Sequence, residues 1–346
     1  MIRIQNIYYM LSYAFQSLKQ QGYMDCITEE FETTAELFSE ILAKGIEMQI
    51  KRGLDRVYCP IKEELGALRG KIDLSETIRT QTFLKHKLIC CYDEFSVNSY
   101  LNQILKTTME ILIRSDISKQ RKVRLRNLMR YFIGVSVRNP NKICWKFRLN
   151  GSNQTYRMLL GICYLTIQGL LQSKGGSQLR LAQYLDDQRM CRLYEKFLLE
   201  YFRKEFPQLK AAALQIPWKL EEENFDQLPI MQTDCVLCFQ EKMLILDAKY
   251  YTHIMQYRKE YNSYTIHSGN LYQIFTYVKN AAEQTKKTVA GMILYAKTEE
   301  DIIPDGNFKM SGNSIHVKTL DLGKPFEQIA AQLNEIIYSY FGVFHS

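Results

Sequence analysis

Two apolar runs between residues 233 and 249 constrain the fold most, because each carries a carboxylate beside residues that suit a buried strand. If the runs pair as a hairpin with Gln240-Glu241 at its tip, Asp234 lies directly opposite Asp247, with Cβ atoms ~5 Å apart. Lys249 shares their face, because side chains alternate along a strand and Lys249 stands two residues beyond Asp247. The pattern therefore predicts two acids and a lysine on one face of a sheet.

Two carboxylates so close together repel each other, and either a shared proton or a cation relieves the repulsion. Oxygen ligands suit Mg²⁺, which binds one or two carboxylates and completes its shell with water and phosphate. Asp234 and Asp247 are thus candidate metal ligands, and Lys249 is a candidate to orient water or stabilise charge on a phosphate. The plainer alternative is a Lys–Asp salt bridge at a sheet edge, with Asp234 merely ending a strand.

Hydrophobic periodicity predicts an α/β (α+β) chain of two domains, which a length of 346 residues also favours. The N-terminal part is mostly helical, with a small β region of short strands separated by residues 63–66. The C-terminal part alternates helices with the strands of a small mixed sheet. We place the boundary at a plausible linker, residues 173–177, so that the predicted domains are 1–175 and 176–346.

The net charge of +8 suits an anionic partner. Its distribution is uneven, because residues 1–190 hold 28 basic and 18 acidic side chains, whereas residues 191–346 hold 17 and 19. No stretch of ~18 apolar residues lacks charges, and the start has no secretory pattern. Nine cysteines, an odd number in a long chain, favour reduced thiols. We therefore expect a cytoplasmic protein without a membrane span.

The densest cluster of like charge lies in a predicted amphipathic helix over residues 117–132. Six basic residues follow one another there with no acid between them, namely Lys119, Arg121, Lys122, Arg124, Arg126 and Arg130. Such a helix either has a solvated basic face or contacts phosphate groups, and the sequence leaves both interpretations open.

Two further predicted helices add residues to the carboxylate pair. Glu195 is an acid in an apolar, aromatic helix upstream of the hairpin, where by itself a solvent-facing position is the simpler account. Gln273 and Tyr277 are four residues apart on a downstream helix and share a face, which ordinary packing also explains. The order of an acid on a helix, an Asp, an Asp-x-Lys strand and a Gln-x-x-x-Tyr helix resembles the RecB-like branches of the PD-(D/E)xK nuclease superfamily. One difference is that Thr233, rather than the proline of the superfamily's motif, precedes Asp234.

Further segments match one family nearly end to end and in the same order. They are Asn6-Ile7-Tyr8-Tyr9-Met10-Leu11-Ser12-Tyr13-Ala14, Lys44-Gly45, Arg52-Gly53-Leu54, Gly70-Lys71-Ile72-Asp73, Thr77-Ile78-Arg79, Asp247-Ala248-Lys249-Tyr250-Tyr251 and Asn270-Leu271-Tyr272-Gln273. With these segments the chain resembles the McrC family, the nuclease subunits of the McrBC modification-dependent (type IV) restriction systems.

The resemblance implies a DNA endonuclease that hydrolyses phosphodiester bonds with Mg²⁺. Asp234 and Asp247 would bind the metal, Lys249 would be the catalytic lysine and Glu195 an accessory acid. Gln273 and Tyr277 would support the site.

The resemblance also implies partners. They are a McrB-type AAA+ GTPase hexamer that recognises methylcytosine in double-stranded DNA, and a second copy of the chain for double-strand cleavage. Residues 1–175 would contact the ring and stimulate GTP hydrolysis. The ring would bind the GTP, because this sequence has no G-x-x-x-x-G-K-[ST] loop. The rival interpretation is a catalytically silent subunit that keeps a nuclease fold and activates the ring.

Overall fold

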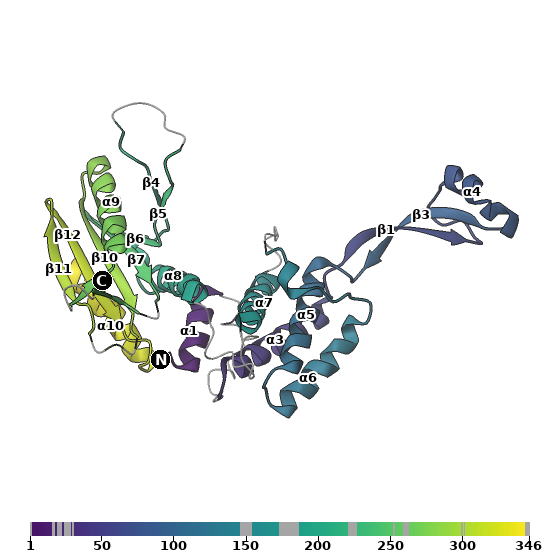
Figure 1. The fold of residues 1–346 in the computed structure, drawn as a ribbon, viewed down its shortest axis with the longest axis horizontal. Coiled ribbons are helices and arrows are strands. Elements are labelled where there is room, and N and C mark those ends of the chain that lie inside the picture. The colour runs from purple at the N-terminus through teal and green to yellow at the C-terminus, as the bar shows by residue number, and fades with distance from the viewer. Residues whose placement is uncertain are drawn as a thin grey trace. The chain divides into compact units, whose positions relative to one another are not determined.

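The computed structural model describes residues 2–15, 18, 23, 29, 31–145, 154–172, 187–220, 227–251, 253–258, 263–298, 300 and 302–342. The chain divides into two compact units, one formed by Met1–Glu32 with Leu185–Ser346 and the other by Thr33–Tyr184 (Figure 1). The predicted linker at 173–177 lies outside the described residues. Among the helices of the described ranges, none is long and apolar enough to cross a membrane.

The first unit is built on a five-stranded mixed sheet with the order β11-β12-β10-β7-β6. Its three inner strands run parallel, and the two outer strands run antiparallel to their neighbours. The strands are β6 (Cys235–Phe239), β7 (Lys242–Lys249), β10 (Thr288–Ala296), β11 (Gly306–Met310) and β12 (Asn313–Leu320). The helices are α8 (Asp187–Glu205), α9 (Ser268–Gln284) and α10 (Phe326–Phe341). The predicted fold class, a small mixed sheet with flanking helices, is confirmed.

Two short ribbons complete this unit outside the main sheet. One pairs β4 (Gln215–Ile216) with β5 (Met231–Gln232), and the other pairs β8 (Met255–Arg258) with β9 (Ser263–Ile266). Strand β5 leads into β6, and the second ribbon lies in the chain between β7 and α9. Both ribbons therefore join the main sheet next to the candidate site.

Helix α9 packs closely on one face of the sheet because β10 has a glycine beneath it. A Cβ at Gly291 would come within 2.6 Å of Ile274 and 2.8 Å of Val278, both on α9. Ile274 and Val278 share a buried apolar cluster with Ile245 of β7 and Ile293 of β10. Because side chains alternate along β7, Asp247 and Lys249 lie on the same face as Ile245, toward α9.

Helix α1 (Ile4–Ala14) packs with the C-terminal part of the chain, whereas the sequence predicts it within the first domain, residues 1–175. Asn6 is buried, and its Nδ2 donates hydrogen bonds to the carbonyl oxygens of Leu322 (2.7 Å) and Lys324 (2.8 Å). The ring of Tyr9 stacks on Phe326 with centroids 4.4 Å apart. The N-terminal segment is thus part of the unit that holds the mixed sheet.

The second unit combines helices with a long β arm (Figure 1). Its helices are α3 (Thr34–Arg52), α5 (Tyr100–Arg114), α6 (Lys119–Met129) and α7 (Gln154–Gln172). In the arm, β1 (Val57–Leu65) pairs with β3 (Leu88–Ser96) over its whole length, and β2 (Lys71–Ile72) and α4 (Leu74–Thr80) lie at the tip. The predicted break at residues 63–66 is therefore misplaced, because β1 continues through Glu63 and Glu64, whose side chains are exposed, and the separation from β2 begins only at Gly66.

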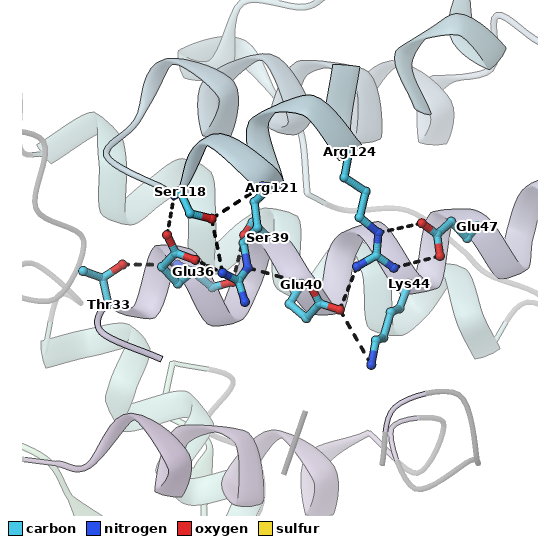
Figure 2. Close-up of polar contacts among 9 residues, drawn as sticks. All are labelled: Thr33, Glu36, Ser39, Glu40, Lys44, Glu47, Ser118, Arg121 and Arg124. Carbon is cyan, nitrogen blue, oxygen red and sulfur yellow. Dashed lines mark hydrogen bonds and ion pairs between the residues drawn. The ribbon is translucent and has the colours of Figure 1, made fainter. Parts of the chain in front are cut away.

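A network of ion pairs joins α6 to α3 and uses part of the predicted basic helix (Figure 2). Arg124 donates to both carboxylate oxygens of Glu47 at 2.7 and 2.9 Å, and to Glu40 at 2.8 Å. Arg121 is paired with Glu36, whose carboxylate also accepts the backbone N–H of Ser118. Two of the six predicted basic residues therefore hold the unit together, and phosphate contact remains a prediction only for the other four.

We predict that Arg124→Ala lowers the free energy of unfolding by about 1–3 kcal/mol, because it leaves the buried carboxylate of Glu40 without its best cation. Arg126→Ala is the matched control on the same helix, since Arg126 is exposed and its loss changes stability by less than about 0.5 kcal/mol. Urea unfolding measures both variants. Equal stability of the two would contradict the assigned role of the network.

Candidate active site

The predicted hairpin forms with the predicted register. Phe239 pairs with Lys242 around a two-residue turn, and Cys235 pairs with Leu246 at the other end of the ladder. The next pair in this register is Asp234 and Asp247, so the two carboxylates meet where β6 begins and β7 approaches its end. Asp234 is fixed there because its Oδ2 accepts the backbone N–H of Ala248 at 2.8 Å.

A chain of hydrogen bonds holds the lysine beside the acids. Lys249 Nζ lies 2.8 Å from Asp247 Oδ2, donates to Asp247 Oδ1 at 3.0 Å and donates to Gln273 Oε1 at 3.0 Å. Gln273 Nε2 donates to the hydroxyl of Tyr277 at 3.0 Å, and that hydroxyl donates to the carbonyl of Gln232 at 3.2 Å. Gln273 and Tyr277 therefore position Lys249, and the chain ends on the backbone two residues before Asp234.

Burial and mutual repulsion act on the two carboxylates. Burial, followed by the charges of Asp247 and Glu195, raises the pKa of Asp234 to about 7. Asp247 is only 3% exposed, and burial raises its pKa although Lys249 opposes the shift. Burial lowers the pKa of Lys249, but Asp247, Tyr251 and Asp234 together raise it by more, so that the amino group stays positively charged. The site thus concentrates negative charge that one lysine does not fully neutralise.

Glu195 belongs to this cluster, since its charge raises the pKa of both aspartates. It lies on α8, and its Oε1 accepts a hydrogen bond from Cys191 Sγ at 3.0 Å. Burial and the Glu195 carboxylate raise the pKa of Cys191 to about 12, so the sulfur remains a protonated donor. The i,i+4 spacing of Cys191 and Glu195 could have indicated this contact, but sequence reasoning missed it.

A second polar group missed by sequence reasoning adjoins Lys249. The hydroxyl of Tyr251 donates to Asn270 Oδ1 at 3.1 Å, and Asn270 Nδ2 donates to the hydroxyl of Tyr295 at 2.9 Å. Tyr295 pairs with Lys249 across β10 and β7. These contacts tie the end of β7 to the first turn of α9, and no local sequence signal marks Tyr295 as part of them.

The donor set fits a divalent cation that keeps water in its shell. Asp247 Oδ2 is buried and accepts no hydrogen bond of suitable geometry, although Lys249 Nζ lies near it. In the part of the chain that the structure describes, no three His, Cys, Asp or Glu side chains stand close enough to enclose a metal by themselves. Mg²⁺ suits such a site, because it is usually bound by one or two carboxylates together with waters and phosphate oxygens.

The five-stranded mixed sheet with its flanking helices has the restriction-endonuclease-like fold of the PD-(D/E)xK type, with one acid just before β6, an Asp-x-Lys sequence on β7 and Gln-x-x-x-Tyr on α9. The profile of one family, described as McrBC 5-methylcytosine restriction system component, matches residues 4–296. The chain belongs to this family, which confirms the resemblance seen in the sequence.

Two other proteins are similar to this chain over most of its length. The type IV methyl-directed restriction enzyme EcoKMcrBC of Escherichia coli (strain K12) is 26% identical over an alignment of 346 positions that covers 98% of this chain and 98% of that protein. A solved chain is also similar, with a TM-score of 0.52 at 19% identity over 96% of this chain and 76% of its own length. It comes from the refined half-complex of Thermococcus gammatolerans McrB AAA+ hexamers with bound McrC. That structural likeness shows the shared fold.

We predict that Asp234→Asn stabilises the metal-free protein increasingly as the pH rises. The folded-state pKa of Asp234, about 7, lies above its ordinary value, so the folded state favours the neutral acid. The wild type therefore loses stability as the pH rises from about 4 through 7, whereas the amide does not ionise. Calorimetry in chelator measures the gap in Tm, about 2–4 °C for each kcal/mol. A gap independent of pH between 5 and 8 would contradict the burial of this charge.

Proposed function

We propose that this chain is the DNA-cutting subunit of a methylcytosine-directed restriction complex and hydrolyses phosphodiester bonds with Mg²⁺. The observation that carries the proposal is the pair of half-buried Asp234 and buried Asp247, with Lys249 held 2.8 Å from Asp247. Three charged groups so arranged at a sheet edge are costly for folding, and perturbed acids of this kind concentrate at functional sites. Membership of the family and the name of the Escherichia coli relative support the same conclusion.

Asp234 and Asp247 would hold the metal ion, which supplies Lewis-acid stabilisation of the phosphate and lowers the pKa of a bound water. Lys249, kept charged by Asp247 and aimed by Gln273, would stabilise the negative charge that develops on the phosphate. Glu195 would accept a proton from water or position it, because its carboxylate faces the same cluster.

Asp247→Ala is expected to abolish cleavage of methylated DNA in the presence of the cognate McrB-type partner, GTP and Mg²⁺. It should leave stimulation of GTP hydrolysis unchanged, because the proposed ring contacts lie in the other unit. Gel analysis of DNA products and phosphate release measure the two activities. Cleavage at the wild-type rate would show that the site is assigned wrongly, whereas a wild-type chain that never cuts would favour the silent regulatory subunit.

The arm of the second unit is the best candidate for contact with the ring partner. Five large apolar side chains near its tip are about half to two-thirds exposed, namely Leu68, Leu74, Ile78, Phe83 and Leu84. Exposed apolar groups gathered in this way mark surfaces that bind other proteins. The similar solved structure contains McrB AAA+ hexamers with bound McrC, and we propose an equivalent ring partner for this chain. A second copy of this chain would cut the other strand of the DNA duplex.

We predict that Ile78→Asp combined with Leu84→Asp reduces GTPase stimulation at least tenfold, because two charges interrupt the apolar tip of the arm. Folding should be unaffected, since these side chains are 66% and 67% exposed. Ile133→Asp is the matched control, because Ile133 is 84% exposed and lies outside the arm in the same unit. Full stimulation by the double variant would exclude the tip as a ring contact.

A further inference from the structure

Helix α6 carries a row of cations on the side that faces away from α3. Its inner side is fixed, because Leu125 and Leu128 are buried and Arg121 and Arg124 project toward α3 (Figure 2). Successive residues of an α-helix turn by about 100°, which places the other four basic residues within ~80° of one another on the opposite side. These four side chains form the basic row, namely Lys119, Lys122, Arg126 and Arg130.

The basic row has no counter-charge in the part of the chain that the structure describes. The acids that pair with α6 do so through Arg121 and Arg124. None of the four side chains of the row lies within 4.0 Å of a described carboxylate. Three of the four are exposed, and Lys122 is half-buried. The row therefore presents its charge to solvent without a partner from these residues.

This arrangement costs the helix stability. Lys119 and Lys122 are three residues apart, and Arg126 and Arg130 follow at intervals of four, so each cation neighbours the next on the helix surface. Like charges at these spacings repel each other. The first turn also contains no acid, although the helix dipole favours carboxylates there. An ordinary solvated face mixes both signs, so an anionic ligand explains the row better than solubility does.

The row is presented on a helix whose orientation is already set. The side chain of Ser118 caps the helix by accepting the backbone N–H of Arg121 at 3.5 Å. Arg124 donates to both carboxylate oxygens of Glu47 on α3, which prevents α6 from rotating about its axis. A ligand would therefore meet four cations in fixed positions, and little ordering of the backbone would oppose its binding.

The unit that contains α6 is positively charged as a whole. Thr33–Tyr184 holds 25 basic and 12 acidic side chains, whereas the rest of the chain holds 20 and 25. Residues 117–185 contain thirteen basic side chains and no acidic one. The positive excess of the chain thus lies entirely in the unit without the candidate active site, and the basic row is its most ordered part.

The spacing of the row suits a nucleic-acid backbone. Eleven residues separate its first member from its last, which corresponds to ~16 Å along the helix. Each strand of duplex DNA carries one negative charge for every ~3.4 Å of helix axis, so several phosphates can face the row at once. Lysine is depleted at interfaces between proteins, and two of the four residues are lysines. These features favour DNA over an acidic protein surface as the ligand.

We propose that the basic row binds the phosphate backbone of duplex DNA, independently of base sequence and methylation. The inference rests on the proposed function, because it takes the DNA that the complex cuts as the ligand. The row adds affinity for DNA and takes no part in cleavage of the bond.

The salt dependence of DNA affinity tests the row directly. Affinity of the full-length chain for a labelled duplex of about two helical turns is measured in chelator by anisotropy between about 0.05 and 0.2 M salt. Combining Lys122→Gln, Arg126→Gln and Arg130→Gln should weaken binding at least about tenfold at the lowest salt and reduce the salt slope by about 2–3. The loss should be the same for methylated and unmethylated duplexes. Unchanged affinity and slope would overturn the inference.

Two control variants separate the row from net charge and from misfolding. Lys210→Gln, Lys286→Gln and Lys309→Gln remove three exposed charges from the other unit and should leave the salt slope unchanged. The charge-conserving set Lys122→Arg, Arg126→Lys and Arg130→Lys should bind DNA within about twofold of the wild type, because phosphate contacts require only the charge. Equal losses in the two glutamine variants, or a tenfold loss in the charge-conserving one, would overturn the inference.

Folding and partner binding are scored on the same proteins. The glutamine variant of the row should unfold at the same urea concentration as the wild type or a higher one, because repulsion along α6 is relieved. Its capture by the immobilised ring partner should equal that of the wild type. Loss of ring binding with full DNA affinity would show that the row contacts protein, which overturns the inference.

Cleavage of methylated DNA by the wild type with the ring partner, GTP and Mg²⁺ tests the proposed function separately. DNA cutting by the wild type, together with an unchanged salt slope in the glutamine variant of the row, rejects the basic row alone. Absence of cutting rejects the proposed function, and the salt slopes still decide whether the row binds DNA.

Discussion

The pairing of β6 with β7 is the constraint on which the candidate site depends. It sets two carboxylates opposite each other at a partly buried sheet edge, where burial, followed by the charge of Asp247, raises the pKa of Asp234 to about 7. A shift of the ladder by one residue would move Asp247 to the other face, away from α9. The register is therefore specified by burial of Ile245 and Val236 on the face that also carries the acids.

Helices packed around these two strands position the other residues of the candidate site. Gly291 lets α9 approach the sheet closely enough for Gln273 to reach Lys249. Helix α8 brings Glu195 to the acids, and Cys191 directs its carboxylate. Helix α1 packs in the same unit, although it comes from the opposite end of the chain. The candidate site thus combines residues from three separate stretches of sequence, and each is held by packing that does not involve the acids themselves.

The hairpin, its register and the shared face of Gln273 and Tyr277 could be predicted because strand alternation and helical spacing are local rules. The long-range contacts could not. Asn6 meets the carbonyl of Leu322 only after folding, so nothing near it in sequence places α1 with the C-terminal unit. The arm was predicted as short strands because Glu63 and Glu64 interrupt the apolar pattern, but β1 continues through them because both side chains are exposed. The ion pairs of Arg121 and Arg124 with acids on α3 likewise could not be predicted, because the partners lie far away in the sequence.

Binding of a divalent ion tests the central claim most directly, because the account requires Asp234 and Asp247 to hold a cation before any chemistry occurs. Electron paramagnetic resonance of Mn²⁺ titrated into the full-length chain reports the bound ion without any contribution from the partner. The account predicts one site in the wild type, displaced by excess Mg²⁺ and lost when both aspartates are replaced by asparagine. Equal Mn²⁺ binding by the double variant and the wild type would contradict it.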